Sequence, residues 1–391
     1  MSMDNRSPKV KRWHFDSVLL ITSVSLLLIG FVMVTSSSLH LGIKQGETAL
    51  HYPIRQLVHI LLGLGVGWVI MKVPVGKWEK VGPALLAFGM VLLLVVLIPG
   101  LGVKVKGSTR WLTIGGLRIQ VSEAVKFFAV IYMAGYVNRR QAKLQSSAMG
   151  LIAPLGLFVV VALLLLMEPD LGSAVVILLI VVGMLFLAGA RLSILFPLGV
   201  VGVVAFALLV YFEPYRMKRI TGFLDPWADP LGTGFQLVQA LISFGRGEWL
   251  GVGLGSGVQK LFYLPEAHTD FLFSVIAEEL GLLGVVTVTA LFALFFWRTF
   301  EIAAAAEKAG QLFAAFLAYG LGLWFGFQAF VNMGVNMGIL PTKGLTLPLM
   351  SYGGGSMIVM CAAVALLFRV HTEIAEIHAS TPKGKSKWQN A

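Results

Sequence analysis

The segment Phe271–Leu294, with the sequence FLFSVIAEELGLLGVVTVTALFAL, is apolar and long enough to cross a bilayer as one helix. It contains two adjacent acids, Glu278 and Glu279, and it follows a polar stretch that ends at Asp270. A carboxylate at membrane depth costs several kcal/mol, so an acid in such a segment usually marks a functional site. On one continuous helix, Asp270 and Glu278 would share a face, about 12 Å apart in depth. The sequence therefore predicts a site at the membrane edge that uses negative charge.

The composition of the whole chain agrees with a membrane protein. Of its 391 residues, 57% are hydrophobic and only 13% are charged, and the mean hydropathy is +0.86. A soluble domain carries about twice that share of charge. The apolar runs are continuous rather than alternating, which excludes a transmembrane barrel. The single cysteine, Cys361, excludes a disulfide framework and a Cys-based metal site.

These runs predict an all-α polytopic membrane protein with about ten transmembrane helices. An even number of spans places both termini on one side. Lys and Arg are denser in the loops on that side, so both termini are expected in the cytoplasm. The predicted spans are Val18–Val34, Leu57–Met71, Pro83–Ile98, Val121–Tyr136, Leu151–Met167, Ser173–Ala188, Ile194–Phe212, Phe271–Trp297, Leu312–Met333 and Ser351–Phe368.

The predicted organisation is an N-terminal tail (1–17), a membrane domain (18–368) and a C-terminal tail (369–391). One large outward loop, 213–268, separates spans seven and eight and contains an apolar run at Phe235–Phe244 that predicts a short helix. Alternating glycines from Gly251 to Gly257 suggest a flexible hinge or, less specifically, a phosphate cradle.

The net charge of +11 follows from the membrane topology and from attraction to anionic lipid, and no nucleic-acid-binding motif accompanies it. The outward loops nevertheless hold two groups of cations, which indicate either an anionic, phosphate-bearing ligand or solvated charge. They are Lys104, Lys106, Arg110 and Arg118 in one loop, and Arg216, Lys218, Arg219, Arg246 and Lys260 in another.

Three further stretches combine polar residues with helix ends. Glu123 and Lys126 are three residues apart at the start of a span and are expected to pair, either as a structural tie or near a ligand. Glu168–Gly172 ends one helix at its proline, and Asp170 is expected to cap the next. The loop Leu340–Ser356 contains two prolines and three consecutive glycines, which permit close backbone approach to an anion.

Taken in chain order, these segments resemble the SEDS family of bacterial cell-wall polymerases, the FtsW/RodA/SpoVE group. The sequence of Leu340–Thr346 resembles the division-type FtsW branch more than the elongation-type RodA branch. One departure is Gly353–Gly354–Gly355–Ser356, where the family commonly has two glycines and two serines. The matching stretches are Lys106–Trp111, Ser122–Lys126, Glu168–Gly172, His268–Phe271 with Glu278–Gly281, and Leu347–Gly354.

The resemblance implies polymerisation of lipid II, a disaccharide pentapeptide on an undecaprenyl diphosphate, in septal cell-wall synthesis on the outer face of the cytoplasmic membrane. Asp270 matches the essential aspartate of the family and would act as general base. The residues expected to contact substrate are Lys106, Arg110, Trp111, Glu123, Lys126, Asp170, Arg246, Lys260, His268, Ser351 and Tyr352, supported by Glu168, Glu278 and Glu279.

The resemblance also implies partners, namely a class B penicillin-binding protein as septal transpeptidase and other divisome membrane proteins. The departing diphosphate needs positive charge, from these cations or from a divalent ion such as Mg²⁺ or Mn²⁺. Two other functions remain open: a lipid II flippase and a non-catalytic divisome scaffold. A flippase should carry charge through the midplane, whereas the ionisable residues here concentrate at the outer edge.

Overall fold

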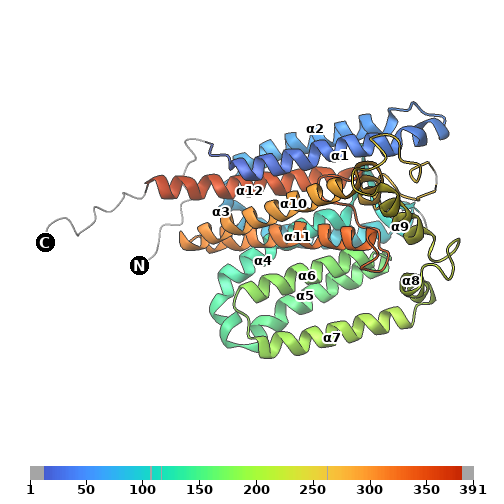
Figure 1. The fold of residues 1–391 in the computed structure, drawn as a ribbon. Coiled ribbons are helices and arrows are strands. Elements are labelled where there is room, and N and C mark those ends of the chain that lie inside the picture. Colours follow the sequence, from blue (N-terminus) through green and yellow to red (C-terminus); the bar gives the residue numbers. More distant parts are fainter. Residues whose placement is uncertain (1–12, 106–107, 116, 262, 381–391) are drawn as a thin grey trace.

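The chain forms a bundle of long helices in a computed structural model that describes residues 13–105, 108–115, 117–261 and 263–380 (Figure 1). The helices are α1 (Ser17–Lys44), α2 (His51–Lys72), α3 (Val75–Leu97), α4 (Val121–Ser146), α5 (Ala148–Met167), α6 (Leu171–Leu187), α7 (Leu192–Tyr211), α8 (Pro214–Leu224), α9 (Phe235–Gly247), α10 (Leu272–Lys308), α11 (Leu312–Asn336) and α12 (Gly355–Ser380).

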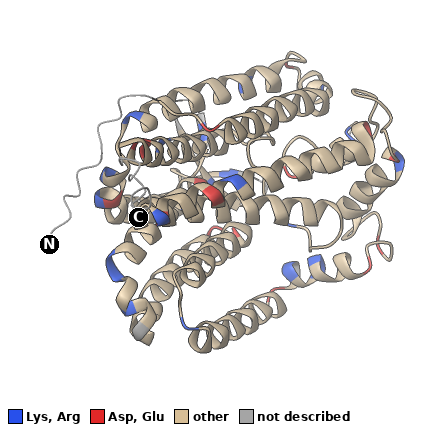
Figure 2. Cartoon of the chain, turned by 60° about the vertical axis from the view of Figure 1, so that its left-hand side comes forward, with Lys and Arg blue, Asp and Glu red and all other residues tan. Residues whose placement is uncertain are grey.

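Eight of the described helices are long and apolar enough to cross a membrane: α1, α2, α3, α5, α7, α10, α11 and α12. Figure 2 shows most of the helix length in tan, with the charged residues gathered mainly toward helix ends and loops. Helix α6 is apolar but has only 17 residues. Helix α4 has 26 residues and carries several charges, among them Glu123 and Lys126. Each apolar run of the sequence overlaps one long helix.

At the last predicted span the apolar pattern begins at Ser351, but α12 begins only at Gly355. The residues between them form a turn, in which Gly354 has a φ of +53°. The predicted short helix at Phe235–Phe244 is confirmed as α9.

The structure corrects the all-α expectation in one place, a small antiparallel sheet between α3 and α4. Its strands are β1 (Val103–Val105), β2 (Ser108–Ile114) and β3 (Leu117–Gln120), paired in that order. β-Branched and aromatic residues in β2 favour this pairing, but they form no long run, so the segment was expected to be a loop. Strand β3 leads directly into α4 at Val121, so the sheet holds the start of α4 next to the residues of β2.

Helix α10 is interrupted at Gly281, where φ is +65° and ψ is −162°. The segment after α9 docks into this break: Val252 N–H donates to the Glu278 carbonyl at 3.0 Å, and Leu282 N–H donates to the Glu248 carbonyl at 2.9 Å. A Cβ on Gly281 would lie 2.4 Å from Gly251 N, so only glycine permits this approach. These bonds satisfy backbone groups that lipid cannot. The first part of the segment with alternating glycines is therefore bound to the backbone of α10 and is not a free hinge.

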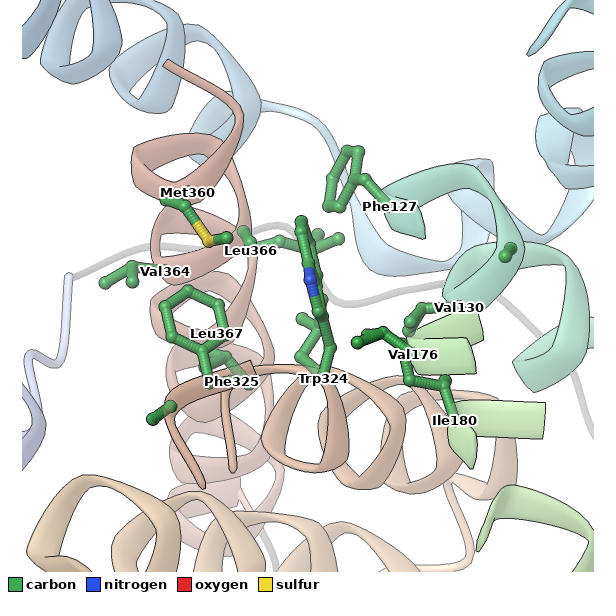
Figure 3. Close-up of a cluster of buried hydrophobic side chains, with 14 of the residues drawn as sticks. Phe127, Val130, Val176, Ile180, Trp324, Phe325, Met360, Val364, Leu366 and Leu367 are labelled. Atoms are coloured by element: carbon green, nitrogen blue, oxygen red, sulfur yellow. The ribbon is translucent and has the colours of Figure 1, made fainter. Parts of the chain in front are cut away.

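The bundle is held together by a core around Trp324, which is fully buried on α11 (Figure 3). Phe127 of α4 and Phe325 of α11 contact its ring, with centroid separations of 6.4 and 5.7 Å. Val176 and Ile180 of α6 lie on the same side of the cluster. The core thus fixes α4, α6 and α11 relative to one another.

Helix α7 stands at the edge of the bundle, apart from the other long helices (Figure 1). Only 11% of the residues in its most apolar 18-residue stretch are buried inside the protein. The first turn of α1 and the last turn of α12 lie at one end of the bundle, whereas α8 and α9 lie at the opposite end.

Candidate functional site

A cavity of about 750 Å³ lies at the α8–α9 end of the bundle. Its walls come from segments far apart in sequence: β2 and β3, the α5–α6 turn, α8, the turn before α10 and the α11–α12 loop. Several residues singled out from the sequence line it together, namely Arg110, Trp111, Glu123, Asp170, Asp270 and Tyr352.

Asp270 is partly exposed in the cavity and lies in a turn just before α10. Phe271 N–H donates to the Glu266 carbonyl at 3.1 Å, which closes this turn and delays the helix until Leu272. The expectation that Asp270 and Glu278 share a helix face is therefore wrong, because Asp270 is not on the helix.

Two asparagines of α11 hold the Asp270 backbone. Asn332 Nδ2 donates to the Asp270 carbonyl at 2.8 Å and also to the Leu345 carbonyl at 2.5 Å, and Asn336 Nδ2 donates to the Asp270 carbonyl at 3.0 Å. Gly344 faces the carboxylate, since a Cβ placed there would lie 2.7 Å from Asp270 Oδ2. The turn of Asp270 and the α11–α12 loop are thus fixed against each other.

The expected ion pair between Glu123 and Lys126 is present and buried, with Lys126 Nζ 2.7 Å from Glu123 Oε1. Lys126 Nζ also donates to Gln328 Oε1 at 2.6 Å, and Gln328 Nε2 donates to the Thr346 carbonyl at 3.0 Å. The second oxygen of Glu123 is buried without a hydrogen-bond partner. This chain of contacts connects the cavity wall of α4 to the loop that follows Lys343.

At the α5–α6 turn, Arg110 Nη1 lies 3.8 Å from Asp170 Oδ1. Arg110 Nε donates to the Glu168 carbonyl at 3.2 Å, and its Nη2 donates to the Pro169 carbonyl. Asp170 caps α6 as expected, because Ser173 N–H donates to its Oδ1, and Ser122 Oγ donates to its Oδ2 at 3.0 Å. Trp111 lines the cavity from the neighbouring position of β2.

Glu168 is fully buried, and neither of its carboxylate oxygens has a hydrogen-bond partner. Burial, with the nearby charge of Asp170, raises the pKa of Glu168 to about 8, against the opposing effect of Arg110. This side chain is therefore mostly protonated at neutral pH, and the net negative charge of the turn is smaller than its sequence suggests.

Tyr352 contacts the rings of Tyr52 and His268 at centroid separations of 5.4 and 5.6 Å. Its backbone N–H donates to the His268 carbonyl at 3.0 Å. Ser351 is buried and accepts a hydrogen bond from Leu347 N–H at 2.9 Å. Tyr352 therefore lines the cavity. His268 and Ser351 are not among the lining residues and instead hold Tyr352 and its loop in place.

Arg246, Lys260, Glu278 and Glu279 form a separate cluster outside the cavity lining. Glu279 pairs with Lys260, and Arg246 lies 3.7 Å from Glu278. Glu278 also accepts from Val258 N–H at 2.9 Å, and Glu279 accepts from Ser36 Oγ at 2.8 Å. These buried acids tie the loop after α9 to α10 and α1, so Arg246 and Lys260 are placed to stabilise the loop.

Lys106 lies outside the described residues. The cavity contains other polar residues that sequence patterns did not select as site residues: Glu213, Arg216, Arg219, Gln236, Glu266, Thr269 and Lys343. Arg216 and Arg219 belong to the outward cations noted above, but nothing in the sequence indicates that α8 lines the same cavity as Asp270. In the described parts of the chain, no three His, Cys, Asp or Glu side chains are grouped to hold a metal ion.

The fold and the cavity define a polytopic helical membrane protein with an acid- and arginine-lined site at one end of the bundle. The sequence matches the FtsW/RodA/SpoVE model, described as "Cell cycle protein", over residues 17–376. The chain therefore belongs to the FtsW/RodA/SpoVE family.

Similar proteins support this assignment. The chain is 60% identical to the "Probable peptidoglycan glycosyltransferase FtsW" of Methylomonas methanica, over 98% of this chain and 100% of that protein. It is 58% identical to the protein of the same name from Methylococcus capsulatus, over 93% and 91% of the two chains.

Two solved structures share the fold. A chain from the structure described as "Structural coordination of polymerization and crosslinking by a peptidoglycan synthase complex" has a TM-score of 0.74 at 31% identity, covering 92% of this chain and 98% of that one. The rod shape determining protein RodA of Thermus thermophilus has a TM-score of 0.68 at 28% identity, covering 91% and 96%.

Proposed function

We propose that this chain is a peptidoglycan glycosyltransferase that polymerises lipid II into glycan strands during septal cell-wall synthesis. The observation that carries the proposal is the position of Asp270, which lines a cavity together with Arg110, Trp111 and Glu123. The full-length similarity to proteins named as FtsW glycosyltransferases supports the same function.

In the proposed reaction, the 4-hydroxyl of the acceptor GlcNAc attacks C1 of the donor MurNAc. The new bond joins that oxygen to C1, and the bond between C1 and the diphosphate oxygen breaks. Asp270 accepts the hydroxyl proton, and the diphosphate leaves with the bonding electron pair. A diphosphate is already a good leaving group, so the reaction needs one base and positive charge rather than the two carboxyl groups of a glycosidase.

The proposed topology has ten spans, with α4 and α6 added to the eight apolar helices, and both termini in the cytoplasm of a bacterial cell. The Glu123–Lys126 pair supports the inclusion of α4, because paired charges are far cheaper within a membrane than isolated ones. The density of Lys and Arg in the loops 72–80 and 139–143 supports the orientation. The cavity then opens to the outer face of the cytoplasmic membrane at the septum.

The proposed partners are a class B penicillin-binding protein and other divisome membrane proteins. The similar chain from a synthase complex that coordinates polymerization and crosslinking supports the pairing with a transpeptidase. A divalent cation, Mg²⁺ or Mn²⁺, would need ligands from the substrate diphosphate, because the described residues group no three metal-binding side chains. In that role it would neutralise charge on the departing group, and Glu123, one oxygen of which has no hydrogen-bond partner, would supply a carboxylate.

The test is to supply labelled lipid II in detergent to the purified protein together with its transpeptidase partner. A glycosyltransferase makes glycan strands under these conditions, because no transfer across a membrane is needed. A flippase makes none but moves lipid II across sealed vesicles, and a scaffold does neither. Absence of glycan from a correctly folded complex would overturn the proposal.

A further inference from the structure

One wall of the cavity carries three cations from two segments: Arg216 and Arg219 on α8, and Lys343 in the α11–α12 loop. Arg216 and Arg219 are three residues apart and share a face of α8. Lys218 lies between them and is exposed, away from the cavity lining. Figure 2 shows blue segments on the short helix that follows α7, at the lower right.

The two segments are joined next to Lys343. Arg219 Nη1 donates to the carbonyl of Thr342 at 3.3 Å, so α8 is bound to the residue that precedes Lys343. Arg216 Nη1 donates to the Leu209 carbonyl at 3.0 Å, which fixes this arginine against the end of α7. Arg216 and Arg219 are therefore each bonded to a backbone carbonyl at the edge of this wall.

Their electrostatic situation differs from that of the other cations of the site. Burial, with the charges of Arg219 and Arg216, lowers the pKa of Lys343 to about 8 from its ordinary value of 10.5. In the described part of the chain, neither Arg216 nor Lys343 makes an ion pair, whereas Lys126 and Lys260 each have a glutamate partner. Like charges brought together in a partly buried wall repel one another, and a bound anion would relieve that repulsion.

The position of this wall relative to Asp270 limits what the anion can be. Gly344 follows Lys343 directly and approaches the Asp270 carboxylate, as described above. An anion held by Lys343 would therefore lie beside the loop that faces the proposed base. Two guanidinium groups and one ammonium group offer several N–H donors to an anion with several oxygens, and arginine in particular binds phosphate oxygens in pairs.

We propose that Arg216, Arg219 and Lys343 form a binding subsite for a lipid-linked diphosphate. The proposal rests on the proposed function, in which two such diphosphates are present: that of the donor, which departs, and that of the acceptor, which is retained. Positive charge that acts on the departing group lowers the barrier, whereas charge that holds the acceptor equally in ground and transition states changes only its binding.

The first experiment measures binding of undecaprenyl diphosphate in detergent by the purified full-length protein. Arg216→Gln, Arg219→Gln and Lys343→Gln should each weaken binding about tenfold or more, as expected for loss of a charged hydrogen bond. Lys218→Gln is the matched control on the same helix and should bind as the unchanged protein does. Size-exclusion profiles and thermal unfolding of each variant show whether it is folded.

The second experiment measures polymerisation of lipid II by the same variants over a range of lipid II concentrations. A lower kcat assigns the subsite to the departing diphosphate, and a higher KM with unchanged kcat assigns it to the acceptor. Folded variants that bind and polymerise like Lys218→Gln would overturn the subsite while leaving the proposed function intact. If the unchanged protein makes no glycan, the proposed function fails, and the binding measurement still decides whether the subsite exists.

Discussion

The side-chain amide of Asn332 binds the backbone carbonyl of Asp270 at 2.8 Å, from within the buried face of α11. The same nitrogen donates to the Leu345 carbonyl, so one amide holds the turn of the proposed base and the loop that faces it. Asn332 touches no part of the cavity itself. Its contribution is the position of Asp270.

Asn332→Ala is expected to lower kcat about 10- to 100-fold with little change in undecaprenyl diphosphate binding, because small displacements of a catalytic group are costly. The effect should depend on Asp270: in an Asp270→Asn background, the same change should cause almost no further loss. Equal losses in both backgrounds would show that Asn332 acts on the fold generally and not on the base.

Asp270→Asn keeps the size of the side chain and removes its basicity. Lipid II polymerisation should fall about 10²–10⁴-fold, the range typical of a lost general base. Binding of undecaprenyl diphosphate should be retained, because the cations are unchanged. Near-normal glycan synthesis by the folded variant would remove Asp270 from its proposed role.

Gly344→Ala tests the close approach of the α11–α12 loop to the carboxylate. The added Cβ would lie 2.7 Å from Asp270 Oδ2, so one of the two must move, and activity should fall about tenfold or more. Gly245→Ala on α9 is the matched control, because a Cβ there meets nothing within 4 Å. Comparable activity in both variants would mean that the loop yields without disturbing the base.

Glu123 and Lys126 are expected to behave as a coupled pair. Glu123→Gln or Lys126→Met alone leaves one buried charge without its partner, which costs about 3–5 kcal/mol and should reduce the yield of folded protein in membranes. The double variant removes both charges and should recover much of that yield. Losses that simply add in the double variant would contradict the coupling.

The sequence predicted those features that depend on neighbours along the chain. Continuous apolar runs located the long helices, and i, i+3 spacing located the Glu123–Lys126 pair. A polar residue after a helix-ending proline located the cap at Asp170. Each of these follows from local geometry and from the cost of unpaired groups in an apolar medium.

The features that were missed depend on segments distant in sequence. No local signal in the sequence indicates that Lys260 pairs with Glu279. Lys260 was therefore grouped with the cations expected to contact substrate, and Glu279 with the supporting acids. The break at Gly281 forms because the backbone of residues 248–253 inserts there, which a run of apolar residues does not reveal. Lys343 is a further example, because it lines the cavity together with Asp270 and residues of α8, all of which are far apart in sequence.

The low pKa of Lys343 makes diphosphate binding depend on pH in a defined direction. Below its pKa of about 8 the free side chain is protonated and attracts the anion, whereas above that pH it is neutral in the unbound protein. Affinity for undecaprenyl diphosphate should therefore fall as the pH rises from 7 to about 9.5, while Arg216 and Arg219 stay charged. In Lys343→Arg the charge persists at every pH of the series, so the decline should be clearly smaller while affinity at pH 7 is largely kept. Glu168, whose pKa is also about 8, ionises over the same range in both proteins and accounts for any decline they share. A decline of the same size in Lys343→Arg would assign the pH dependence to another group.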